Sequence, residues 1–140
     1  MPTPSCTPPE ATFRIHARLE DIQQLTQFVR AYATARGLDK VAVDDLELAV
    51  AEASSNVVVH GYADGRGELS VELTYADPLL RLELIDAGTP IPRGKLESSA
   101  PSDPMAESGR GMAIIRACVD QLSYRSEAGF NRLVLTKRSR

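Results

Sequence analysis

The fold is decided by residues 47–61, which read ELAVAEASSNVVVHG. Apolar residues recur at helical spacing through this stretch and the positions before it, so the pattern predicts a helix from about Val43 to Val59. Gly61 follows as a natural helix stop. The apolar face of the predicted helix carries Leu46, Val50, Ala53 and Val57.

A polar stripe runs along the same predicted helix. Glu52 and Asn56 are four residues apart, which places them on one face of a helix, one turn from each other. An Asn oxygen is a suitable ligand for Mg²⁺, and a Glu carboxylate accepts a proton or orients a hydroxyl, so the pair suits a magnesium-phosphate site. His60 is expected to interact with the last helix carbonyls. A solvent-facing stripe is the alternative, although the neighbouring Ala and Val residues leave little solvated surface.

In the rest of the chain, the spacing of apolar residues predicts two more helices and five short strands. The helices run from Glu20 to before Gly37 and from Gly111 to Val119. The strands are 13–17, 69–75, 80–84, 122–125 and 133–137, with turns at Asp77-Pro78 and Gly129. This order predicts an α/β two-layer sandwich (α+β) with a mixed, largely antiparallel sheet and helices on one face. Regular βαβ alternation is lacking, which disfavours a Rossmann fold.

A second candidate motif is Asp86-Ala87-Gly88-Thr89-Pro90, at the end of a predicted strand. The Asp86 carboxylate there is able to accept a hydrogen bond from an exocyclic amine, and Gly88 lets the backbone approach a flat ring. Taken alone, Asp and Gly before Pro also fit an ordinary turn.

A third candidate motif is Gly109-Arg110-Gly111, which precedes Met112 at the start of the last predicted helix. Unpaired N–H groups and the helix dipole favour an anion such as a phosphate at this place. Arg110 either pairs with that phosphate or is solvated, and a glycine hinge is the simpler explanation of the two glycines. Residues 88–108 before it form a long connection, of the kind expected for a functional lid or a disordered segment.

Composition narrows the class of protein. A chain of 140 residues with a net charge of −3 fits one domain, 11–140, after a flexible Pro-rich tail, 1–10, and has no broad cationic surface for nucleic acid. No apolar run approaches the roughly 20 residues of a membrane span, and the N-terminus does not resemble a signal peptide, so we expect a cytoplasmic protein. Cys6 and Cys118 are expected to be free thiols.

The order of the three motifs is more specific than any one of them. Residues 52–61, then 86–90, then 109–112 resemble the N, G1 and G2 boxes of the GHKL ATP-binding superfamily, over residues 12 to 137. The short chain and the run starting at Glu47 resemble the anti-sigma-factor serine kinases of the RsbW and SpoIIAB type. Two departures stand out: the chain has Gly129-Phe130-Asn131 where such proteins often have Gly-Thr, and its second glycine box is only Gly-x-Gly.

This resemblance implies a site that binds ATP and Mg²⁺. It implies Glu52 as the catalytic base and Asn56 as the Mg²⁺ ligand. It further implies adenine recognition by Asp86 and Gly88, and phosphate contacts around the G2 box, which contains Gly109, Arg110, Gly111 and Met112.

The implied function is that of an anti-sigma factor and serine/threonine kinase. It would phosphorylate an anti-anti-sigma partner with a STAS domain and sequester a sigma factor, as a homodimer for which the first strand and helix offer a surface. One alternative is a binding module that holds its partner, with ATP as an allosteric ligand or with no nucleotide. Another is a histidine-kinase catalytic domain, which is disfavoured because no helix with a phospho-accepting His precedes the domain.

Overall fold

The computed structural model describes residues 8–62, 64–92 and 107–139. The strands and helices agree in type and order with the expectation. The strands are β1 (Ala11–His16), β2 (Glu68–Ala76), β3 (Leu79–Asp86), β4 (Gln121–Glu127) and β5 (Phe130–Arg138). The helices are α1 (Ile22–Ala35), α2 (Lys40–Asn56) and α4 (Glu107–Cys118), with a 3-10 turn η1 (Leu19–Asp21) and a π-helical turn η2 (Val57–Gly61).

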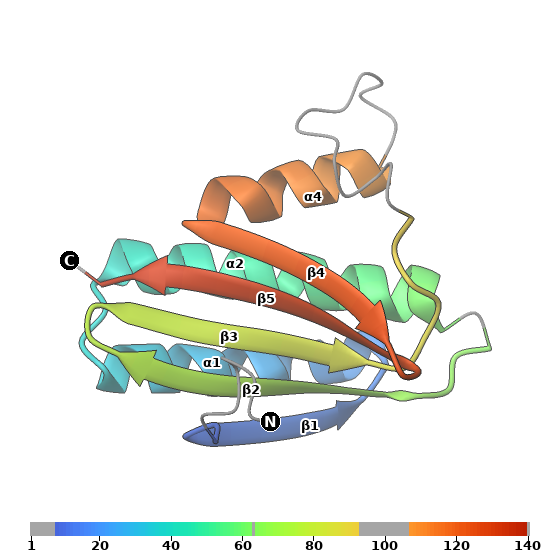
Figure 1. Ribbon diagram of the computed structural model, residues 1–140, viewed down its shortest axis with the longest axis horizontal. Coiled ribbons are helices and arrows are strands. Elements are labelled where there is room, and N and C mark those ends of the chain that lie inside the picture. Colours follow the sequence, from blue (N-terminus) through green and yellow to red (C-terminus); the bar gives the residue numbers. More distant parts are fainter. Residues whose placement is uncertain (1–7, 63, 93–106, 140) are drawn as a thin grey trace.

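The strands form one five-stranded sheet in the order β1-β2-β3-β5-β4, and every neighbouring pair is antiparallel (Figure 1). β3 is the central strand and pairs along its whole length with β2 on one side and β5 on the other. The three helices lie together on one face of the sheet. The two-layer fold with helices on one face is therefore confirmed, and the sheet that was expected to be mixed and largely antiparallel is antiparallel in every described pair.

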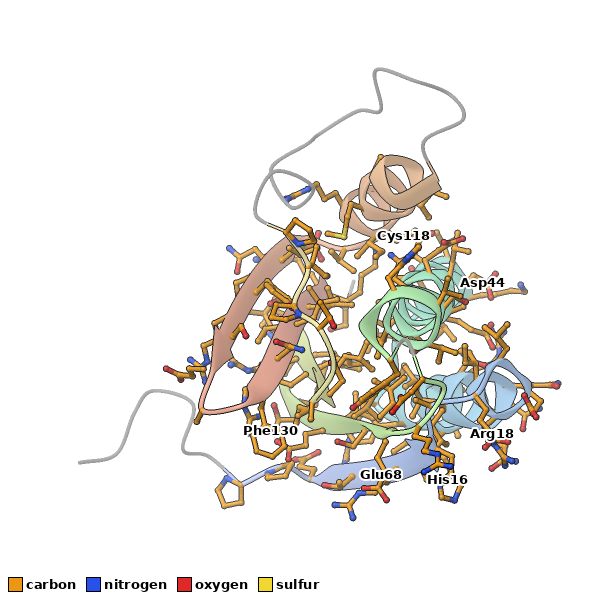
Figure 2. All side chains as sticks on the ribbon, turned by 90° about the vertical axis from the view of Figure 1, so that its right-hand side faces the viewer. His16, Arg18, Asp44, Glu68, Cys118 and Phe130 are labelled. Atoms are coloured by element: carbon orange, nitrogen blue, oxygen red, sulfur yellow. The ribbon has the colours of Figure 1, made fainter. Side chains whose placement is uncertain are left out.

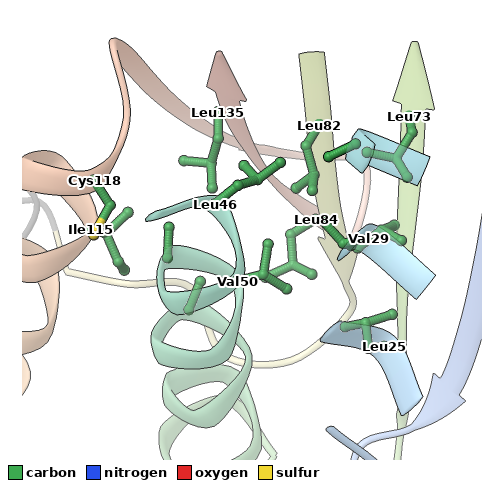
Figure 3. Packing of buried hydrophobic residues seen from close by; sticks show 14 of the residues in the cluster. Leu25, Val29, Leu46, Val50, Leu73, Leu82, Leu84, Ile115, Cys118 and Leu135 are labelled. Carbon is green, nitrogen blue, oxygen red and sulfur yellow. The ribbon is translucent and has the colours of Figure 1, made fainter. Parts of the chain in front are cut away.

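The core lies between the sheet and the helices, and alternation along the strands builds it. In β3, Leu80, Leu82 and Leu84 point to the helices and are buried, as expected for a strand with one face on a core. Helices α1, α2 and α4 all contribute buried side chains to the same cluster (Figure 3). The drawn members include Leu25, Val29, Leu46, Val50, Ile115 and Leu135.

Helix α2 begins and ends earlier than its apolar pattern predicts. It starts at Lys40 because Asp39 caps it: the Asp39 carboxylate accepts a hydrogen bond from the Ala42 N–H at 2.8 Å. Regular α geometry ends at Asn56, and the chain continues as the π turn η2 rather than as α-helix to Val59. The π turn holds three consecutive β-branched valines, which lose rotamer freedom in an α-helix.

Helix α4 begins at Glu107, four residues before the predicted start at Gly111. The predicted start was wrong because the two glycines were interpreted as lying before the helix. Glycine costs only about 1 kcal/mol in a helix and does not forbid one. The Gly109-Arg110-Gly111 motif consequently lies inside the first turns of α4 and not ahead of the helix.

Most of the expected tail, and residues 93–106 of the expected lid, lie outside the described residues. Glu10 is described and is fixed to the sheet: its N–H donates to the Leu73 carbonyl at 2.7 Å, and its carboxylate pairs with Arg36 at 2.8 Å. Within the described part of the chain, none of the helices has both the length and the apolar character that crossing a membrane requires.

We expect Leu46→Ala to lower the free energy of unfolding by about 2–5 kcal/mol, because Leu46 is fully buried and truncation leaves a cavity. Chemical denaturation of the two proteins measures the difference. Leu48→Ala, on the exposed side of the same helix, serves as the control and should change stability by less than about 1 kcal/mol. Equal losses in both variants would contradict the assigned packing of α2.

Candidate active site

The end of α2 presents two polar side chains toward open space. Glu52 and Asn56 are both half-buried. Within the described residues, neither side chain takes part in a hydrogen bond or an ion pair. A carboxylate and an amide that the fold itself does not use are available to a ligand.

Helix α4 brings a glycine against this pair. A Cβ atom added at Gly111 would lie 3.2 Å from Nδ2 of Asn56 and 3.6 Å from Oε2 of Glu52. A side chain at this position would crowd both polar groups, so glycine is what lets the start of α4 approach them. The structure thus brings together Glu52, Asn56 and Gly111, which sequence analysis took from two separate motifs.

The other end of α4 is fixed by Lys137 on β5. Its ammonium donates to the carbonyl of Cys118, the last residue of the helix, at 2.7 Å, and pairs with Asp45 of α2 at 3.2 Å. A cation at a helix C-terminus is favourable because it offsets the negative end of the helix dipole. Burial and the nearby Asp45 carboxylate raise the pKa of the Cys118 thiol. Lys137 therefore holds α4 alongside α2.

A cavity of about 240 Å³ opens between η2, β3 and the start of α4. Most of its described wall is apolar, and its few polar side chains are those of Asn56, His60, Asp86, Thr89 and Tyr124. The apolar wall includes Val57, Leu84, Ile91, Met112, Ile115 and Leu133. An apolar slot with a few convergent polar groups is typical of a small-molecule site.

A second cavity, of about 250 Å³, adjoins the first and shares Asn56 and His60 with it. Its described lining adds Glu52, Ser55, Val59, Gly111 and Ile114. Asn56 thus stands between an apolar cavity that ends at Asp86 and a more polar one that contains Glu52.

Asp86 is the buried anion of the apolar cavity, with 7% of its surface exposed. Its Oδ1 accepts hydrogen bonds from Nδ2 of Asn131 at 2.8 Å and from the Gly88 N–H at 2.8 Å. Burial raises the pKa of the Asp86 carboxyl, and these two hydrogen bonds oppose part of that rise. Among the described residues both bonds fall on the same oxygen, so Oδ2 is left to accept from a ligand.

Gly88 makes a close contact within the protein itself. It packs against the backbone of Gly61: an added Cβ would overlap the Gly61 carbonyl oxygen and lie 2.7 Å from the carbonyl carbon. The same carbonyl accepts a hydrogen bond from the Thr89 N–H at 2.7 Å. The close approach that glycine permits here is between the end of η2 and the end of β3.

Three residues that sequence analysis did not assign to the site hold the backbone of its wall in place. Asn131 also donates to the Gly88 carbonyl at 2.9 Å, and the Tyr62 hydroxyl accepts from the Ala87 N–H at 2.7 Å. The Tyr124 hydroxyl accepts from the Ile91 N–H at 2.9 Å. The sequence held a signal for Asn131, because Gly129-Phe130-Asn131 departs from the Gly-Thr expected there from the resemblance. It held no signal for Tyr62 or Tyr124.

The predicted residues are thereby located as follows. Asn56, Asp86 and Met112 line the apolar cavity, Glu52 and Gly111 line its polar neighbour, and Gly88 supports the wall. Gly109 and Arg110 lie in the first turn of α4, and the Arg110 side chain is outside the described part.

The Asn56 amide on α2 lies between two adjoining cavities. One ends at the buried Asp86 carboxylate, the other is lined by Gly111 in the first turns of α4, and helices cover one face of the antiparallel sheet. This arrangement is that of an ATPase domain of the GHKL class. The chain belongs to the family of histidine kinase-like ATPase domains, whose family model matches residues 15–137.

The chain is also similar in sequence to individual proteins. The chain is 29% identical over 99 residues to the anti-sigma F factor of Clostridium acetobutylicum, covering 69% of each protein. It is 23% identical over 131 residues to the serine-protein kinase RsbW of Bacillus cereus strain AH187, covering 89% of this chain and 81% of the relative.

Among solved structures, the chain is similar in fold to the RsbU and RsbW domains of a Mycobacterium tuberculosis protein. The TM-score is 0.67 at 24% sequence identity, and the match covers 94% of this chain and 33% of that one.

We expect Gly88→Ala to lower the free energy of unfolding by about 1–3 kcal/mol, because the new methyl group overlaps the backbone of Gly61. Gly61→Ala is the matched control, since a Cβ there meets its nearest atom, Cγ1 of Val57, at an ordinary 3.6 Å. Denaturant unfolding of both variants decides the matter. A neutral Gly88→Ala would refute the close backbone contact.

We expect the contribution of Asp86 to stability to fall as pH rises above the ordinary carboxyl value of 3.8. Folding raises the pKa of this carboxyl group. Between its pKa in the unfolded chain and its higher pKa in the folded state, the folded state therefore binds more protons than the unfolded chain, and the free energy of unfolding decreases as the pH rises. The measurement is the difference in unfolding free energy between the native protein and Asp86→Asn as a function of pH. A difference that grows with pH would mean that the hydrogen bonds outweigh burial.

Proposed function

We propose that this chain is an anti-sigma factor and an ATP-dependent serine/threonine kinase that phosphorylates an anti-anti-sigma protein with a STAS domain. In this proposal it also binds a sigma factor, which competes with the anti-anti-sigma protein. The observation that carries the kinase assignment is the meeting of Glu52, Asn56 and Gly111 next to a cavity that ends at the buried Asp86.

Adenine fits the apolar cavity. Its flat ring suits walls such as Leu84, Ile91 and Met112, and its exocyclic amine is a donor for the free oxygen of Asp86. Gly88 contributes by holding the wall in place. The phosphates then extend toward the first turn of α4, where the N–H groups of Gly109 and Arg110, with Gly111 close by, favour anions.

Mg²⁺ fits the donor set through one protein ligand. Within the described residues, no three His, Cys, Asp or Glu side chains gather to hold a metal ion by themselves. Mg²⁺ commonly takes one or two protein oxygens plus phosphate oxygens and water, and the Asn56 amide oxygen would be such a ligand. When bound, the ion supplies neutralisation of phosphate charge.

Glu52 serves as the general base. It accepts the proton of a serine or threonine hydroxyl as the hydroxyl oxygen bonds to the γ-phosphorus and the bond from that phosphorus to the bridging oxygen breaks, leaving ADP. The half-buried carboxylate is free of described partners, so it is able to take this proton.

The names of the relatives support the partners. One relative is named as an anti-sigma factor and another as a serine-protein kinase, and this chain spans most of each. The STAS domain, a cytoplasmic location and a homodimer through β1 and α1 are further parts of the proposal. β1 is an edge strand, which leaves one side of it open for a partner.

We expect Glu52→Gln to lower phosphoryl transfer to a STAS-domain protein from the same genome by about 10²–10⁴-fold, the usual contribution of a general base. Binding of ATP and Mg²⁺, measured by calorimetry, should persist in this variant because Gln has nearly the same shape. Transfer is followed with γ-labelled ATP. Asn56→Ala should instead lose the Mg²⁺-dependent part of nucleotide binding.

Glu47→Gln is the matched control, because it makes the same change on the same helix at a residue that pairs with Arg30. It should leave transfer unaffected. Undiminished transfer by Glu52→Gln would rule out Glu52 as the base. A native protein that holds its partner without transferring phosphate would instead be a binding module.

A further inference from the structure

Three large apolar side chains are exposed along the outward face of α2 and its π-helical extension. Val41, Leu48 and Val59 have 70%, 46% and 55% of their surface exposed. At 100° per residue, Val41 and Leu48 of α2 fall within about 20° of one direction around the helix, and Val59 follows them on the π turn. We call these three residues the α2 stripe.

Glu52 lies in the same direction around the helix. It follows Leu48 by four residues, about one turn, and precedes Val59 by about two turns. The stripe spans about 27 Å from end to end, at 1.5 Å per residue. The catalytic base of the proposed function therefore stands in the middle third of an exposed apolar row.

Charged neighbours of the stripe are already paired within the chain. The acids on the flanks of α2 each have a cation within ion-pair distance, so the polar rim is internally neutralised. The pairs are Asp44 with Lys40 and Arg30, Glu47 with Arg30, and Asp45 with Lys137. What the rim leaves for an incoming surface is chiefly the apolar stripe and the Glu52 carboxylate.

The stripe leads into the polar cavity of about 250 Å³ that contains Glu52 and Ser55, and Val59 forms part of the lining of that cavity. This volume admits a hydroxyl-bearing side chain next to the Glu52 carboxylate. If the residue that enters this cavity belongs to a folded protein, the surface of that protein around the residue contacts the surrounding face of α2.

We propose that the α2 stripe is the docking surface for the phosphoryl-accepting protein, a folded protein that presents an apolar patch beside its serine or threonine. The inference rests on the proposed kinase function. A hydroxyl reaches Glu52 only if its carrier covers this part of α2, and 27 Å matches the width of a protein interface of about 800 Å² per partner. A small acceptor would have no use for Val41, which is about 16 Å along the helix from Glu52.

The test is steady-state kinetics with the STAS-domain protein that the native chain phosphorylates. Leu48→Glu places a charge in the docking surface and should raise KM for that protein by about tenfold or more, as expected for a residue near the centre of an interface. Because Leu48 does not touch the cavities, kcat and the affinity for ATP with Mg²⁺ should stay within about twofold of native values. Leu48→Ala should shift KM in the same direction, less strongly.

Phe130→Glu is the matched control. Phe130 is similarly exposed, at 52%, but lies on the β4–β5 hairpin, on the opposite side of the molecule from Asp44 of α2 (Figure 2). This variant should leave KM for the acceptor unchanged.

The outcomes separate the two proposals. An unchanged KM in Leu48→Glu, with transfer still lost in Glu52→Gln, overturns the docking surface and leaves the kinase standing. If the native chain binds the acceptor without phosphorylating it, and Leu48→Glu weakens that complex about tenfold in calorimetry, the kinase fails and the docking surface stands. If the native chain neither binds the acceptor nor phosphorylates it, both proposals are overturned.

Discussion

The contact on which the site depends is between two backbones. The carbonyl of Gly61, at the end of η2, lies against Gly88 and accepts the N–H of Thr89 just after β3. This contact joins the end of the longest helix to the end of the central strand. Asn56 and Asp86 line one cavity because these two ends cannot separate while the contact holds. No side chain other than hydrogen fits between them at position 88.

Helix α2 has two faces with opposite tasks. One face buries residues such as Leu46 and Val50 against the leucines of the sheet, and this burial is what fixes the helix in space (Figure 3). The other face keeps Glu52 and Asn56 half-buried, and neither side chain forms a hydrogen bond or an ion pair with another residue that the structure describes. The polar residues gain their fixed positions from the apolar ones, so the fold needs no bond to Glu52 or Asn56 themselves.

Much of the fold was predictable from the sequence because its signals are local. Apolar spacing located α1 and α2, and the Asp77-Pro78 and Gly129 turns located the two hairpins. The start of α4 was not predictable, because glycines at 109 and 111 have low helix propensity and tertiary packing supports a helix there all the same. The partners of Asn131 and Gly88 were also out of reach, because they lie 45 and 27 residues away in the chain and only packing brings them together.

The last strand of the sheet is inserted between its neighbours. β5 pairs with the central strand β3 on one side and with β4 on the other, and it carries both Asn131, which holds Asp86, and Lys137, which holds α4. During synthesis every other described element leaves the ribosome before β5. A nascent chain that has made α2 and β3 still lacks these two supports, so the walls of the cavity are fixed in place only after β5 has been translated.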